Sequence, residues 1–323
     1  MRWRGERQSD NVEDRRDEGG GGFGFPGGGV RFPSGGGGGG RGGGIGIVGL
    51  LIILGLMFFF GVDPSVILQG GPDDGSIPNI QLPQPRSEPT GLPVPQRQGP
   101  QVQHPETASE DDLKQFVSVV LADTEDVWNS LFQQYGERYS DPTLVLYSGG
   151  IRSACGTGVA AMGPFYCPND EKVYIDLSFY EELKNRFRAP GDFAQAYVIA
   201  HEIGHHVQKL LGIMDQVEAV RQRMGERQAN ALQVRVELQA DCFAGVWANH
   251  AQEMKNIIEP GDIESAMNAA AAIGDDKIQK QTQGYVVRDA FTHGSSEQRV
   301  RWFTRGYQSG KLEECDTFNT QQL

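Results

Sequence analysis

The chain has 323 residues, including 44 glycines and 17 prolines, and its formal net charge is −13. This acidic balance argues against nucleic acid as the main partner, because phosphate binding needs a basic face. Glycine is concentrated in residues 19–44, where there is little side-chain surface to bury, so the composition excludes a single soluble globule.

The N-terminal segment, residues 1–44, carries seven arginines and six acidic residues besides the glycine tract. A polar, nearly charge-balanced and glycine-rich composition is typical of disorder. We therefore predict that residues 1–44 form a disordered segment.

An uncharged apolar run follows in residues 45–62 (IGIVGLLIILGLMFFFGV). As a helix it would cover about 27 Å, close to the hydrocarbon thickness of a bilayer, which predicts one transmembrane helix. A cleavable signal peptide would lie nearer the N-terminus and end at a small-residue site, and a buried core helix would have amphipathic flanks. Neither feature is present here.

Charges on either side of the apolar run predict its orientation. Arg31 and Arg41 precede it, whereas Asp63, Asp73 and Asp74 follow it. By the positive-inside rule the N-terminus is expected in the cytoplasm of this single-pass membrane protein. Everything after Val62 is then expected in the periplasm or outside the cell.

Beyond the apolar run, residues 63–108 are rich in Pro, Gln, Gly and Ser and are typical of an extended linker. Residues 109–323 are long enough for one substantial core.

All four cysteines lie in residues 109–323, and an even number in an oxidising compartment favours two disulfides. The short spacing favours Cys155–Cys167, and hence Cys242–Cys315. Buried free thiols are the alternative, whereas no C-x₂₋₄-C spacing suggests a cysteine-ligated zinc.

The patterns in residues 109–323 predict an α+β domain, mostly helical with a small antiparallel sheet. A helix is expected over 111–135, a strand over 143–147 and a hairpin formed by 165–167 and 172–177. The helices expected after the hairpin span 178–187, 193–211, a long segment ending near 251, 263–273 and 296–307.

The helix expected over 193–211 contains an H-E-x-x-H motif, with His201, Glu202 and His205. Four residues turn a helix by about 400°, so the two histidines share one face and can bind one Zn²⁺. Glu202 can then act as general base on the water at the metal. Gly204 is expected to leave backbone space beside the metal. The alternative is a pair of surface histidines on an ordinary helix.

A third zinc ligand must come from elsewhere in the chain, and Glu237 and Asp241 share a face of the next long helix at positions i and i+4. Both lie among apolar residues, where an unpaired carboxylate is costly. We predict that Glu237 binds the metal while Asp241 accepts the N–H of His201. A solvated acidic edge is the alternative.

His293 lies in a loop before the last helix, where Ser295 and Gln298 form a capping box. His293 or Arg299 could stabilise the oxyanion of a tetrahedral intermediate. Local hydrogen bonding for the histidine and a surface ion pair for the arginine are equally compatible with the sequence. His206 is expected to miss the metal, and His250 to lie at the surface.

Three motifs together resemble one family: HEIGHH at 201–206, VELQADCFAGVWA at 236–248 and FTHGSSEQRVRWF at 291–303. They resemble the bacterial membrane-anchored neutral zinc metallopeptidases, and more distantly the gluzincins of the CAAX-protease and heat-shock-protease group. That resemblance implies a zincin-like domain with ligands His201, His205 and Glu237, base Glu202, Asp241 behind a ligand, and His293 with Arg299 near the oxyanion. Gly294 departs from the proline of the distant group.

The resulting expectation is a membrane-anchored zinc endopeptidase that acts on peptides or proteins, with an extended substrate aligned along the edge of the hairpin strand 172–177. A zinc-containing scaffold without activity is one alternative, although a structural zinc needs no base and usually has four protein ligands. A non-peptide amidase of the cell envelope is the other.

Overall fold

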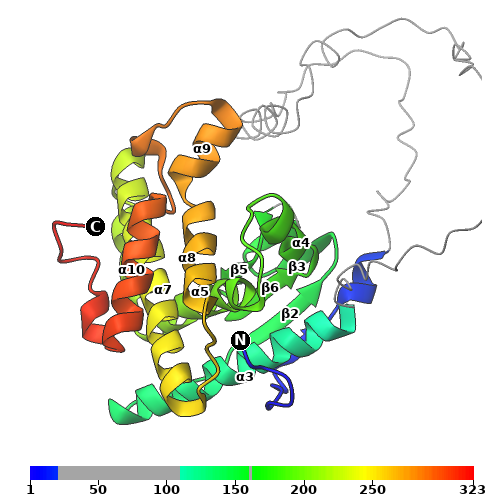
Figure 1. Cartoon of the computed structure of the whole chain (residues 1–323). Coiled ribbons are helices and arrows are strands. Elements are labelled where there is room, and N and C mark those ends of the chain that lie inside the picture. The colour runs from blue at the N-terminus through cyan, green and yellow to red at the C-terminus, as the bar shows by residue number, and fades with distance from the viewer. Residues whose placement is uncertain (21–109, 160–161) are drawn as a thin grey trace, which may run out of the picture. The chain divides into compact units, whose positions relative to one another are not determined.

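The computed structural model describes residues 1–20, 110–159 and 162–323, and its centre is helix α5 (Asp192–Leu210). Every residue of α5 from Ala196 to Gln208 is buried. A helix that is buried on all sides must be covered on all sides. Figure 1 shows that α7, α8 and α10 lie on one side of α5 and the sheet on the other, and α5 contacts both groups.

The helices of the domain agree with the predicted positions within a few residues. They are α3 (Glu110–Gln134), α4 (Ser178–Asn185), α5, α6 (Ile213–Arg221), α7 (Glu226–Lys255), α8 (Asp262–Ala272), α9 (Asp275–Gln283) and α10 (Ser296–Ser309). The capping box of Ser295 and Gln298 at the start of α10 is confirmed. Helices α6 and α9 were not predicted separately, because α9 is strongly polar and α6 has no buried residue.

The main sheet has four strands in the order β1-β2-β6-β5. They are β1 (Val12–Asp14), β2 (Thr143–Tyr147), β6 (Lys172–Asp176) and β5 (Phe165–Cys167). The β5–β6 hairpin is antiparallel as predicted, but β1 and β6 both run parallel to β2, so the expected antiparallel sheet is in fact mixed. A separate antiparallel pair is formed by β3 (Gly150–Ser153) and β4 (Gly156–Val159).

Strand β6 is an interior strand, so the expectation that residues 172–177 offer a free edge to a substrate is wrong. It pairs with β2 on one side and with β5 on the other. An incoming peptide adds only to a strand with unpaired N–H and C=O groups. In this sheet the outer strand of the hairpin is β5.

Residues 1–20 are ordered, which corrects the predicted disorder for this part of the N-terminal segment. Strand β1 pairs with β2 in the register Val12 with Leu144, and the Leu144 N–H donates to the Asn11 carbonyl at 2.9 Å. In Figure 1 the blue N-terminal segment runs beside β2 and α3. The prediction rested on the glycine tract in residues 19–44. The residues before that tract have few glycines and include apolar side chains, such as Trp3, that can be buried.

Trp3 fastens this N-terminal segment to the core. Its indole is 5% exposed and meets Phe116 of α3 edge-on, with ring centroids 5.4 Å apart. The indole N–H donates to the Asp192 carboxylate at 2.8 Å. Asp192 is the first residue of α5, so Trp3 touches the start of the central helix.

Where the structure describes the chain, no helix is both long enough and apolar enough to cross a membrane. The predicted transmembrane helix, residues 45–62, and the predicted linker, residues 63–108, lie outside the described residues.

Replacement of Trp3 by alanine should lower the free energy of unfolding by about 3–5 kcal/mol, because it removes a large buried aromatic side chain. Chemical denaturation of the full chain measures this change. Glu6→Ala, at an exposed position of the same segment, is the matched control and should leave stability nearly unchanged. Equal stability of the two variants would contradict the docking of residues 1–20.

Candidate metal centre

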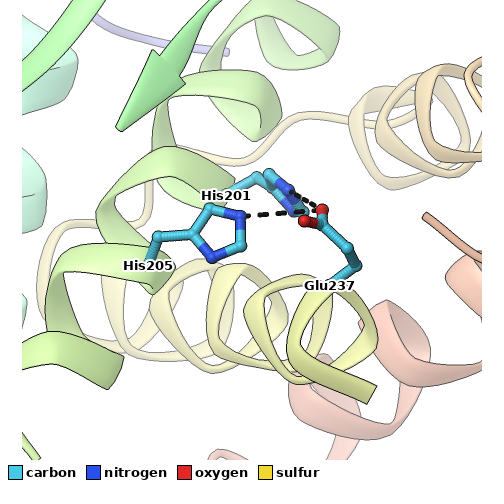
Figure 2. A group of neighbouring side chains, drawn as sticks. All are labelled: His201, His205 and Glu237. Carbon is cyan, nitrogen blue, oxygen red and sulfur yellow. Dashed lines mark hydrogen bonds and ion pairs between the residues drawn. The ribbon is translucent and has the colours of Figure 1, made fainter. Parts of the chain in front are cut away.

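The structure brings the three predicted ligands together. His201 and His205 project from α5 and Glu237 projects from α7, and Figure 2 shows their side chains converging. Candidate ligand atoms of the three residues all lie within 4.8 Å of one another, and each residue is less than a tenth exposed. Among the described residues this is the one cluster of His, Cys, Asp or Glu that could hold a metal ion.

The spacing of the cluster suits zinc. The Glu237 Oε2 atom lies 3.2 Å from His201 Nε2 and 3.6 Å from His205 Nε2. Two ligands at Zn–N and Zn–O distances of about 2.0–2.2 Å in tetrahedral geometry are roughly 3.3–3.5 Å apart. Three nitrogen and oxygen ligands leave a fourth position for water or substrate, as in catalytic rather than structural zinc sites. The residues present therefore fit a catalytic zinc ion.

Asp241 contacts His201, the first candidate ligand. Its Oδ1 lies 2.9 Å from His201 Nδ1. A carboxylate can only accept, so Nδ1 carries a proton, and Nε2 is the ring nitrogen that faces Glu237 and the metal position. Asp241 itself is fully buried. Burial raises the pKa of Asp241, but Arg299 and His201 outweigh this and lower it to about 2.

Arg299 is placed behind His201. Its Nε and Nη2 donate to the two carboxylate oxygens of Asp241 at 2.8 and 2.9 Å, and the side chain is 2% exposed. Tyr197, which the sequence analysis did not single out, donates its hydroxyl to the same carboxylate. These two bonds to Asp241 favour a role for Arg299 in holding the carboxylate behind His201 over the predicted contact with an oxyanion.

Two glutamines complete the surroundings of the ligands, and neither was predicted. Gln233, one turn before Glu237 on α7, donates to Glu237 Oε1 at 2.9 Å. Gln208, three residues after His205, places its Oε1 2.9 Å from His205 Nδ1. Their positions at i−4 and i+3 from the ligands were a signal in the sequence, because such residues share a helix face.

Glu202 is buried beside the cluster, with 8% of its surface exposed. Burial raises the pKa of its carboxyl group, while the nearby histidines lower it. A carboxylate with a raised pKa accepts a proton more readily near neutral pH, which suits a general base.

His293 lies on the loop before α10, near the cluster. Its side chain is 52% exposed. The charge of Glu237 raises the pKa of His293, and the charge of His293 lowers the pKa of Glu237. Asp275 at the start of α9 holds the loop by accepting from the backbone N–H groups of Thr292, His293 and Gly294 at 2.6–3.0 Å. Because His293 Nδ1 lies 3.2 Å from Asp275 Oδ1, its Nε2 is the ring atom left for a substrate.

Asp275 was not predicted because it begins the polar helix that was missed. Partial burial lowers the pKa of His293, but the hydrogen bond with Asp275 and the charge of Glu237 outweigh it and raise that pKa. His293 therefore keeps a proton more readily than an isolated imidazole.

The remaining histidines lie away from the metal position. His206 is buried, with Nδ1 3.1 Å from the Tyr166 hydroxyl and Nε2 2.7 Å from the Ser140 carbonyl, and it is not part of the three-residue cluster. His250 is partly exposed and contacts the Gly310 carbonyl at 2.8 Å. His104 lies outside the described residues.

Gly204 allows the two ligand-bearing helices to meet. A Cβ atom at this position would lie 2.9 Å from the carbonyl oxygen of Ala240 on α7. The missing side chain of Gly204 therefore makes room for α7, and not for the metal as expected. A larger residue would push α7 away, and with it Glu237.

Both predicted disulfides are present, Cys155–Cys167 and Cys242–Cys315. The first links the β4 turn region to β5, and the second ties α7 to the C-terminal segment. All four cysteines of the chain are paired.

Comparison with known proteins places the chain in a family. The model of the family described as "Putative neutral zinc metallopeptidase" matches residues 1–318. The match includes the N-terminal segment as well as the domain, and the chain belongs to this family.

Relatives come from distant bacteria. The uncharacterized protein YpfJ of Escherichia coli K12 is 48% identical over 319 residues, covering 98% of this chain and 99% of YpfJ. The uncharacterized proteins Rv2575 of Mycobacterium tuberculosis and Mb2605 of Mycobacterium bovis are each 41% identical over 222 residues, covering 66% of this chain and 74% of the relative. No solved structure matches significantly.

Zinc affinity should fall as the solution becomes more acidic. In the metal-free cluster burial lowers the pKa of His201, but Asp241 and Glu237 raise it to about 9. Zinc must therefore displace a proton at neutral pH, which gives about a tenfold rise in affinity per pH unit for each proton displaced. Chelator competition across the neutral range tests this, and affinity independent of pH would contradict it.

Proposed function

We propose that the protein is a zinc-dependent endopeptidase. The observation that carries the proposal is the cluster of His201, His205 and Glu237, with three buried ligands at tetrahedral spacing and a carboxylate base adjacent in sequence. Membership of the neutral zinc metallopeptidase family supports it. A purely structural zinc would need neither an open fourth position nor Glu202, so the arrangement disfavours a silent scaffold.

A zinc ion held by the three ligands would supply Lewis-acid activation of water and of the scissile carbonyl. Glu202 takes the proton from the attacking water and passes it to the leaving amine. Its raised pKa lets the same carboxyl group perform both transfers.

His293 binds the oxygen of the scissile carbonyl as negative charge develops on it. Asp275 holds the ring through Nδ1 and the loop through its backbone, and Nε2 donates the hydrogen bond. The raised pKa of His293 supports this role, because a protonated ring donates from both nitrogens. Arg299 acts one step further back, through Asp241 and His201.

We also place this activity outside the cytoplasm. Two disulfides in a chain whose cysteines are all paired support an oxidising compartment. The substrate is a peptide or protein.

Glu202→Gln should reduce turnover about 10²–10⁴-fold while zinc remains bound, because only the general base is lost. Glu237→Ala should lose both turnover and zinc. Cleavage of a peptide library, with and without chelator, and the zinc content of each variant measure these effects. Full activity of Glu202→Gln would remove the base assignment. Failure of wild type to cut any peptide, with zinc bound, would favour a non-peptide amide as substrate.

A further inference from the structure

A chain of buried amides runs from the second zinc ligand to a disulfide. His205 Nδ1 lies 2.9 Å from Gln208 Oε1, Gln208 Nε2 lies 3.0 Å from Gln239 Oε1, and Gln239 Nε2 lies 3.0 Å from the Cys315 carbonyl. Both glutamines are buried, with 0% and 5% of their surfaces exposed. The endpoint, Cys315, is bonded to Cys242 of α7.

The direction of this chain follows from its carbonyl contacts. Gln208 Nε2 also lies 2.8 Å from the Val236 carbonyl, which can only accept, so the amide nitrogen of Gln208 must face α7. Its oxygen then faces His205 and accepts. The Cys315 carbonyl orients the amide of Gln239 in the same way. A backbone carbonyl oxygen thus determines which side-chain atom of each glutamine is the nitrogen and which is the oxygen.

We propose that Gln208 is a positioning residue for the metal centre, held by Gln239 and the Cys242–Cys315 disulfide. By accepting from Nδ1–H, Gln208 keeps His205 in the tautomer whose Nε2 faces Glu237. It does for His205 what Asp241 does for His201, but through a neutral group. This proposal rests on the proposed zinc site.

Gln208→Leu keeps the approximate size of the side chain and removes the acceptor. The zinc dissociation constant, from chelator competition, should rise about 10–100-fold, the range usual for partners of metal ligands. Gln239→Leu should give a smaller rise, because Gln208 keeps its bond to Val236. The matched control is Gln252→Leu on α7, whose side chain bonds to Asn256 and Ile258 just beyond that helix and which should leave zinc affinity unchanged.

A spectroscopic measurement separates positioning from general destabilisation. Long-range ¹⁵N–¹H spectra of the metal-free full-length protein, recorded at a pH high enough for His205 to be neutral, should show its proton on Nδ1 in the wild type and a mixture of tautomers in Gln208→Leu. Wild-type zinc affinity and tautomer in Gln208→Leu would overturn the proposal. Because neither readout uses turnover, an absent peptidase activity would count against the proposed function alone.

A second inference comes from the N-terminal segment. The contacts between residues 1–18 and the domain extend along the whole segment: Trp3 in the core, Arg7 with Glu125 at 2.9 Å, and β1 paired with β2. Glu13 adds an ion pair with Lys172 at 2.6 Å. These bonds need direct contact, whereas the hydrocarbon layer of a bilayer is about 30 Å thick.

We infer that residues 1–18 and residues 110–323 lie in the same oxidising compartment. The predicted orientation, with a cytoplasmic N-terminus and an external domain, would put a bilayer between β1 and β2. Both statements cannot hold. Since the disulfides assign the domain to an oxidising compartment, the N-terminal segment follows the domain.

Single-cysteine labelling of the full chain in spheroplasts of a bacterial host tests this placement. Gln8→Cys and Arg223→Cys introduce a thiol at exposed positions of the two parts, and all native cysteines are paired. A membrane-impermeant maleimide should label both variants before lysis to the same extent. If only Arg223→Cys is labelled before lysis, the two parts do not share a compartment. If both variants are labelled only after lysis, the shared compartment is the cytoplasm and the assignment to an oxidising compartment is wrong.

Discussion

The close approach of α5 and α7 at Gly204 and Ala240 is the contact on which the site depends. Helix α5 carries two candidate ligands and the proposed base, and α7 carries the third candidate ligand and the carboxylate behind His201. Helices α7 and α10 also approach closely at a glycine, because a Cβ at Gly306 would lie 1.9 Å from the Cys242 carbonyl. Three helices are thus packed backbone to backbone, and this brings polar side chains from separate helices within bonding distance.

The charge at the metal centre is balanced by groups in the layer behind it. Asp241 is a fully buried anion, and leaving such a group unpaired costs several kcal/mol. Arg299 donates to both of its oxygens, and Tyr197 and His201 both bond to Oδ1. The second ligand has a neutral amide instead. This difference keeps the buried charge low while each imidazole presents Nε2 to the centre.

Residues 1–20 join the centre to the far end of the sheet. Trp3 bonds to Asp192 where α5 begins, and β1 extends the sheet that packs against the same helix. The N-terminal segment therefore supports the helix that carries the H-E-x-x-H motif. Matching of the family over residues 1–318 includes this segment, as a structural role for it requires.

Local patterns were sufficient to pick out the three residues that cluster, His201, His205 and Glu237, both disulfides and most helix positions, because each rests on spacing within one element or on simple pairing rules. His201 and His205 share a face in any helix, and Glu237 and Asp241 do so in another. Only the tertiary structure decided what lies between elements: the parallel pairing of β1, β2 and β6, the placement of Arg299 behind His201, and the roles of Gln208 and Asp275. Those depend on contacts between residues far apart in the chain, for which no local periodicity exists.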